Sequence, residues 1–109
     1  MVDEIPDDAL VVRGGLNQPE DLLRGTATHP SGVTGISVEC AEGKTVEELS
    51  EAIPHGKVGV TTVDKVRDSG GDVIRTSGRS KNHATMTGLS PEDASRLLNP
   101  VKPNPQKNK

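Results

Sequence analysis

The chain has 109 residues, no aromatic side chain and a net charge of −3, and its length fits one small domain. Leu, Ile and Val together account for 24 residues, about 22% of the chain, just above the level of roughly 20% below which disorder is the usual expectation. The composition predicts a thin folded core, stabilised if needed by a partner or an oligomer. It excludes aromatic cages for cations and aromatic platforms for bases, so base stacking has to come from His or Arg.

The sequence also limits where the protein can act. Cys40 is the only cysteine, so no intramolecular disulfide can form. The first ten residues are acidic rather than basic and precede no apolar signal segment, and no apolar run approaches the 18 residues that a membrane span needs. We expect a protein without a signal peptide or membrane contact, either cytoplasmic or delivered as part of a secreted system.

The first half of the chain shows short elements separated by turns. Residues 1–8 are predicted to be a flexible acidic lead, and residues 9–99 a single α+β domain. The apolar run at 9–13 predicts a strand that ends at two glycines. The segment 18–25 predicts a short helix with proline at its first position, and the alternation at 32–40 predicts a second strand.

The next helix has the clearest signals. Thr45 and Glu48 fit a capping box, and Val46, Leu49 and Ile53 share one helical face. The β-prone segment KVGVTT follows. Thr61 and Asp64 then form a second possible capping box, for a helix that ends near Gly70.

The last third predicts a hairpin and a helix. The segments DVIRTS and HATMTG are read as strands around the loop GRSKN, and Ser90 with Pro91 begins a helix with an apolar stripe. Residues 100–109 are predicted to be a flexible tail rich in Pro and Lys. Together these elements predict a mixed sheet of about four to five short strands with three to four helices.

Five side chains suited to phosphate chemistry lie within eleven residues, at Arg75, Arg79, Lys81, His83 and Thr85. If the strand with Arg75 pairs with the strand of His83 and Thr85, both of the latter project from one face. Histidine serves as general acid or base near neutral pH, and cations and hydroxyls stabilise a phosphate. We predict a phosphodiester site with His83 and Thr85 as catalytic residues and Arg75, Arg79 and Lys81 as substrate-binding residues.

The charge distribution agrees with an anionic ligand for the second half. The first 54 residues have a net charge of −8, whereas the remainder have +5. A metal-independent ribonuclease needs a second acid or base, which His55, Glu39 or His29 could supply. The alternative is that His83 is an ordinary strand residue. No cofactor or metal site is predicted, because the three histidines lie about 26–28 residues apart.

Arg13 follows an apolar strand and precedes two glycines. This strand–Arg–Gly pattern resembles the first motif of ADP-ribosyltransferase-like folds, and the resemblance implies an arginine that holds the dinucleotide. GISVE would then be the second strand. Those sites usually stack nicotinamide on an aromatic residue, which this chain lacks. The alternative is that Arg13 forms a salt bridge at the strand end, to Asp7 or Asp8.

The segments VVRGG, GISV, TVEELSEAIPHGKVGVTTVDKVRDSGGDVI and NHATMTGLSPEDASRLLNPVKPNP resemble a family of small, uncharacterised bacterial proteins. Similar modules look like C-terminal segments of large secreted polymorphic-toxin proteins. The resemblance covers about residues 9–105 and implies a toxin-associated domain, but it assigns no residue a role. Three functions follow as hypotheses: action on RNA or a phosphate-bearing ligand, a non-catalytic module that docks a cognate protein through its last helix and tail, and an ADP-ribosyltransferase-like fold using Arg13.

Overall fold

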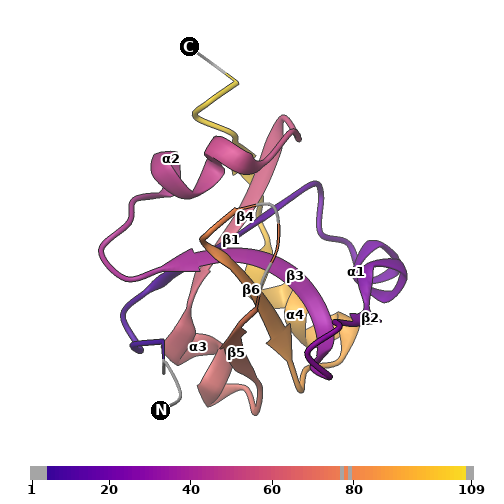
Figure 1. Cartoon of the computed structure of the whole chain (residues 1–109). Helices are drawn as coiled ribbons and strands as arrows, with labels where there is room; N and C mark the ends of the chain where they lie inside the picture. Colours follow the sequence, from indigo (N-terminus) through magenta and orange to yellow (C-terminus); the bar gives the residue numbers. More distant parts are fainter. Residues whose placement is uncertain (1–4, 77, 79, 108–109) are drawn as a thin grey trace.

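The computed structural model describes residues 5–76, 78 and 80–107. Helices and a β-sheet alternate along this part of the chain, which confirms the mixed α and β class (Figure 1). Its elements are β1 (Leu10–Gly14), α1 (Pro19–Gly25), β2 (Ala27–Thr28), β3 (Thr34–Ala41), α2 (Val46–Leu49), the 3₁₀ turn η1 (Ser50–Ala52), β4 (Lys57–Thr62), α3 (Val63–Asp68), β5 (Asp72–Arg75), β6 (His83–Thr87), α4 (Pro91–Leu98) and β7 (Lys102–Pro103). Of these described helices, none is long and apolar enough to cross a membrane.

The sheet is antiparallel and has seven strands in the described part of the chain. Its order is β5-β6-β3-β1-β4-β7, with β2 beside β3. The expectation of a mixed sheet with four to five strands is therefore wrong, whereas the expected three to four helices are confirmed. The extra strands β2 and β7 have two residues each, too few for a visible pattern. Helices α1, α2 and α3 have 7, 4 and 6 residues, shorter than a crossover between neighbouring parallel strands requires.

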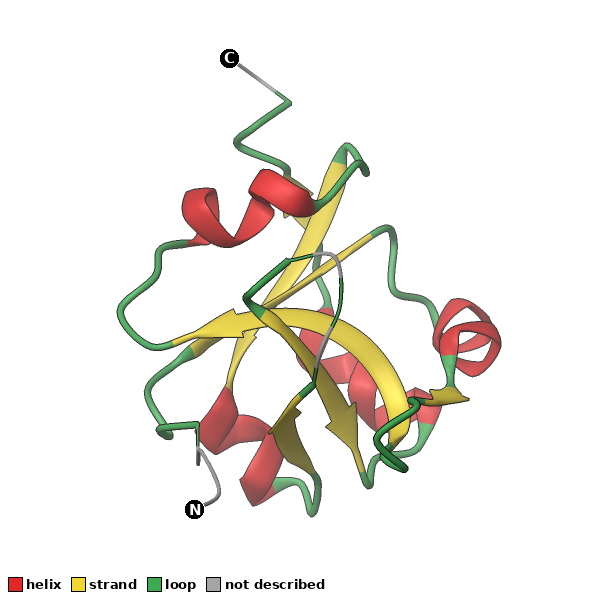
Figure 2. Cartoon of the chain, in the orientation of Figure 1, coloured by secondary structure: helices red, strands yellow, loops and turns green. Residues whose placement is uncertain are grey.

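The sheet has helices on both faces, so its strands separate two apolar clusters (Figure 2). Helices α1, α3 and α4 bury Leu22, Val66 and Leu98 against one face. The smaller cluster on the other face joins Leu49 and Ile53, from α2 and the end of η1, to Val12 and Val58 of the sheet. Valine and leucine thus fill the space that aromatic residues would occupy in other domains of this size.

Two predicted helix starts have the expected caps. The backbone N–H of Glu48 donates to Thr45 Oγ1 at 3.2 Å, and the Thr45 N–H donates back to Glu48 Oε1 at 3.1 Å. The Asp93 N–H donates to Ser90 Oγ at 3.2 Å. Each bond satisfies a backbone donor that lacks a partner within its helix, which is why these sequence signals were reliable.

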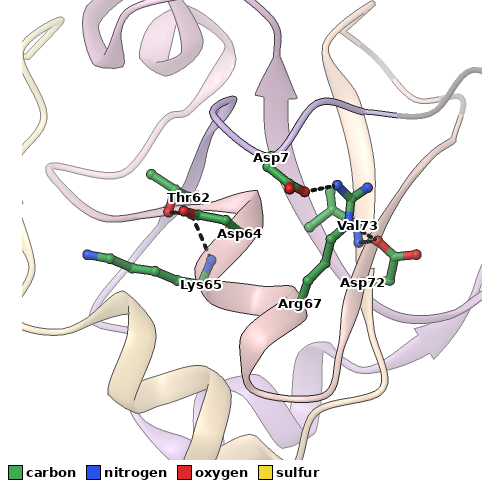
Figure 3. Close-up of polar contacts among 7 residues, drawn as sticks. All are labelled: Asp7, Thr62, Asp64, Lys65, Arg67, Asp72 and Val73. Carbon is green, nitrogen blue, oxygen red and sulfur yellow. Dashed lines mark hydrogen bonds and ion pairs between the residues drawn. The ribbon is translucent and has the colours of Figure 1, made fainter.

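The predicted capping box at Thr61 is wrong. Helix α3 begins one residue later, after Thr62, whose hydroxyl donates to the Asp64 carboxylate (Figure 3). Thr61 is instead a buried residue of β4, 4% exposed. Because β4 continues directly into α3, Thr61 belongs to the strand and not to the start of the helix.

The folded unit is longer than the predicted 9–99 at both ends. Ile5 is 4% exposed, and Asp7 forms an ion pair with Arg67, which also donates to Asp72 (Figure 3). At the other end, Asn104 is fully buried and donates to the carbonyl oxygens of residues 53 and 55. Residues predicted to belong to a flexible lead and a flexible tail therefore pack against the domain.

Gly35 tests the close contact between β3 and β6. A Cβ atom at Gly35 would lie 2.1 Å from the carbonyl oxygen of Met86, so Gly35→Ala has to push the two strands apart. We expect the free energy of unfolding in urea to fall by about 1–3 kcal/mol. Gly56→Ala is the matched control, because a Cβ there meets no heavy atom within 4 Å; equal losses for the two variants would contradict the packing described.

Candidate functional site

Strands β1 and β3 separate before either one ends. Their ladder extends from Leu10–Ala41 to Val12–Glu39. Beyond that pair, β1 continues to Gly14 beside β4, whereas β3 continues toward its start beside β6. The separation leaves a cleft between the end of β1 and the middle of β3.

Two hollows lie at this cleft, with volumes of about 140 and 350 Å³. Both are lined by Arg13, Gly14 and His55. The smaller hollow is also lined by Ser37 and Glu39 of β3, and the larger one by the loop after β1 and by Asp21 of α1. Together they fall within the size range of small-molecule sites, about 300–1,000 Å³.

Arg13 spans the separation of the strands. Its Nη1 donates to the carbonyl oxygen of Ser37 at 2.7 Å, while its Nε is buried and has no hydrogen-bond partner among the described residues. Burial lowers the pKa of the Arg13 guanidinium, and the Asp21 carboxylate acts in the opposite direction. Because arginine stays protonated in proteins, the cleft holds a partly desolvated cation with an unused N–H donor.

The missing side chain of Gly14 leaves room for the imidazole ring of His55 at the cleft. A Cβ atom at Gly14 would lie 2.5 Å from Cδ2 of His55, so only glycine lets the ring approach the strand this closely. The carbonyl oxygen of His55 accepts a hydrogen bond from Asn104 Nδ2 at 2.8 Å, which ties this loop to the C-terminal segment. The exposed His55 ring therefore lies over Gly14 and lines the same two hollows as Arg13.

Glu39 lines the smaller hollow from β3, but it projects from the face of its partner Val12, opposite to the face of Arg13. It is half-buried, and its Oε1 is buried with no hydrogen-bond donor among the described residues. Its cross-strand partner on β6 is His83, and residues directly opposite each other in an antiparallel pair project from the same face. The carboxylate thus lies between the Arg13 cleft and the predicted 75–87 site.

The predicted catalytic residues form a hydrogen-bonded chain. Thr76 Oγ1 is hydrogen-bonded to His83 Nδ1 and to Thr85 Oγ1, at 2.9 Å in both cases. Thr85 is 3% exposed, so its hydroxyl is directed at Thr76 rather than at solvent. The His83 ring lies 5.8 Å from the ring of His29, measured between centroids. His29 was one of the candidates for the second acid or base, but no sequence pattern predicted that the two imidazoles lie close together.

Two of the predicted substrate-binding cations, Arg75 and Lys81, belong to the described residues. Arg75 is opposite Ala84 in the ladder and so belongs to the other face of the sheet, although its Nη1 donates to the carbonyl oxygen of His83 at 3.2 Å. Lys81 is exposed. It lines a hollow of about 340 Å³ together with Glu39 and two acids of the α2 and η1 region, Glu48 and Glu51. The prediction for Arg79 lies outside the described residues.

Cys40 is a core residue of β3. The side chain is fully buried, and burial raises the pKa of its thiol to about 11, against smaller opposing effects of Arg75 and Arg67. A protonated, inaccessible thiol is a poor nucleophile. No group of three or more His, Cys, Asp or Glu side chains that could hold a metal ion occurs among the described residues.

Searches of family models, curated proteins and solved structures found no match to this chain. The chemistry of the cleft is accordingly inferred from its own residues. Of these, Arg13 carried a sequence signal in the strand–Arg–Gly pattern, and Glu39 was one of three candidates for the second acid or base of the 75–87 site. His55 was another of those candidates, but its position beside Arg13 was not predicted, because it depends on the bare backbone of Gly14 and on the distant Asn104.

The state of Cys40 can be tested by alkylation. With a thiol pKa of about 11 in the folded protein and about 8.5–9 in the unfolded chain, iodoacetamide at pH 8 should react about 100-fold more slowly with the folded form. The measurement is the modification rate by mass spectrometry with and without guanidinium chloride. Similar rates in the two conditions would show that the thiol is accessible and ionisable in the folded state.

Proposed function

We propose that this protein binds a phosphate-bearing nucleotide in the cleft between β1 and β3, with Arg13 as the ligand of the phosphate. The observation that carries the proposal is the buried Nε of Arg13, which has no partner in the described structure. A buried donor without an acceptor is costly, whereas a charge-assisted bond to phosphate is among the strongest of protein hydrogen bonds. An anion in the cleft would use a donor that the fold leaves free.

The other groups of the cleft favour a nucleotide over a simple anion. In a chain without Phe, Tyr or Trp, the His55 ring is one of three imidazoles that can stack on a base, and it lines both hollows next to Arg13. Arginine with its planar donors suits phosphates in particular. A phosphate at Arg13 and a base beside His55 would occupy the two adjoining hollows.

This arrangement favours the ADP-ribosyltransferase-like interpretation, and a dinucleotide such as NAD is the first ligand to test. The strand containing GISVE is β3, which pairs directly with the strand of Arg13. That placement agrees with the resemblance, which implies an arginine strand followed by this second strand. His55 would take the stacking role that an aromatic residue usually has.

The proposal is tested by titrating ADP and NAD into the protein by calorimetry. Arg13→Gln removes the charge of the guanidinium, so we expect the dissociation constant for both ligands to rise about 10- to 100-fold, as for a lost hydrogen bond to a charged group. Arg96→Gln is the control, since Arg96 is exposed on α4 and pairs only locally with Asp93. If wild-type protein binds neither ligand, the proposal fails.

A second proposal keeps RNA as substrate for the 75–87 face. The observation in its favour is the 5.8 Å separation of the His29 and His83 rings, because RNA cleavage through the 2′-hydroxyl uses one acid and one base. In this proposal His83 is the acid or base, Thr85 orients the phosphate through Thr76, and Lys81 contacts the RNA backbone. The acids beside Lys81 would oppose phosphate binding there, which is why we place this function second.

The RNA proposal predicts that the purified protein degrades a labelled single-stranded RNA without added metal, and that His83→Ala and His29→Ala each lower the rate at least 100-fold. His55→Ala is the matched control, because His55 lines the other cleft. The measurement is the cleavage rate on a gel in the presence of a chelator. If the wild-type protein leaves the RNA intact, the RNA proposal is contradicted.

The interaction-module hypothesis stays a prediction. Helix α4 buries Ala94, Ser95 and Leu98 within the domain, and β7 pairs with β4. The two elements expected to dock a cognate protein are therefore partly occupied by contacts within the chain itself.

A further inference from the structure

We propose that Thr76 and Thr85 hold the neutral His83 ring with its proton on Nε2, so that His83 is a hydrogen-bond donor to the phosphate of the ligand. The inference rests on the second proposed function, because it takes this ligand to be an RNA on the 75–87 face. It deepens that function by making His83 the group that stabilises charge on the phosphate. It also makes Thr76, which no sequence pattern singled out, a positioning residue.

The two threonine hydroxyls and the imidazole ring form a chain of three polar groups. Thr76 Oγ1 lies 2.9 Å from His83 Nδ1 and 2.9 Å from Thr85 Oγ1. Each hydroxyl has one proton to donate, so the hydrogen bonds of the chain run in one of two directions. Either Thr85 donates to Thr76 and Thr76 donates to Nδ1, or the Nδ1–H group donates to Thr76 and Thr76 donates to Thr85.

Burial of the two hydroxyls decides between these directions. Thr76 and Thr85 are 7% and 3% exposed, and the Thr85 hydroxyl has Thr76 as its hydrogen-bond partner. In the first direction both hydroxyl protons have an acceptor. In the second direction the Thr85 proton has no acceptor among the described residues, and a buried donor without an acceptor is costly. The first direction is therefore favoured, and Nδ1 of His83 accepts a hydrogen bond.

An accepting Nδ1 fixes the form of the ring. In a neutral imidazole one nitrogen carries the proton and the other accepts, so the proton of His83 lies on Nε2. Because Nδ1 is bound to Thr76, Nε2 is the ring nitrogen left for a ligand. A general base needs a lone pair on Nε2, and a general acid needs a proton on Nδ1 as well. Both of these forms require the disfavoured direction of the chain, so the ring is arranged as a neutral donor.

The loop before β6 keeps this donor in place. A Cβ atom at Gly78 would lie 2.4 Å from Cγ of His83, so the bare backbone of Gly78 lies against the ring. The His83 backbone N–H donates to the carbonyl oxygen of Ser80 at 3.1 Å, and its carbonyl oxygen accepts from Arg75 Nη1 at 3.2 Å. A donor that is fixed before the ligand binds is what stabilisation of a developing charge requires, and a neutral imidazole can serve as that donor.

Nitrogen NMR of the ¹⁵N-labelled protein, at a pH of about 8.5 where free histidine is neutral, reads the position of the ring proton. In the wild type His83 should have an unprotonated Nδ1 and a protonated Nε2, whereas the exposed His55 should show a mixture of the two neutral forms. Thr76→Val removes the hydroxyl and should shift the His83 signals toward that mixture, while Thr76→Ser should retain the wild-type pattern. Thr62→Val is the control, because the Thr62 hydroxyl bonds Asp64; it should leave the His83 signals unchanged.

The cleavage assay with labelled RNA tests the role toward phosphate. Thr76→Val should lower the rate about 10- to 100-fold, because a donor that is no longer fixed loses much of its effect on the transition state, and Thr76→Ser should stay close to the wild type. A protonated Nδ1 in the wild type, or unchanged ring signals in Thr76→Val, would overturn the inference whether or not RNA is cleaved. If the ring has the expected form but the RNA stays intact, the second proposed function fails, and the role of His83 toward phosphate fails with it.

Discussion

The site depends on the separation of β1 from β3 after the pair Val12–Glu39. Up to this pair the two strands share a ladder, and beyond it each continues with a different neighbour. The hydrogen bond from Arg13 to the Ser37 carbonyl crosses the separation at 2.7 Å and supplies a partner to a backbone group that the ladder no longer satisfies. A continuous ladder at this point would leave no cleft, no desolvated arginine and no unpartnered carboxylate.

The packing around the cleft explains how a chain without aromatic residues can form it. Apolar clusters on both faces hold the sheet in place, and glycines at 14 and 35 allow contacts that any larger residue would prevent. The C-terminal segment supports one wall from behind, because Asn104 donates to the carbonyl oxygens of Ile53 and His55 from a fully buried position. Polar contacts and close backbone approach thus replace part of the missing apolar volume.

Local signals predicted local structure well. The caps at Thr45 and Ser90, the left-handed Gly70 and most strand positions followed from the sequence, since each depends on residues within one turn. Strand directions, the two-residue strands and the contacts of the chain ends depend on pairings across the whole chain, and they could not be predicted from the sequence.

The same limit applies to the candidate site. Arg13 carried a sequence motif, but its closeness to His55 and Glu39 results from the tertiary fold. Of the cations expected around His83, Arg75 belongs to the opposite face of the sheet, which only the strand register shows.

The most direct measurement of the central claim is a titration of ¹⁵N-labelled protein with ADP, followed by amide chemical shifts. The account predicts that the amide shifts are concentrated in residues that line the cleft, namely Arg13, Gly14, Ser37, Glu39 and His55. The segment from Lys81 to Thr85 should be unaffected, except for His83, which is paired with Glu39 across the strands. Shifts centred on Lys81 and His83, or no shifts at millimolar ADP, would contradict the assignment of the cleft between β1 and β3 as the ligand site.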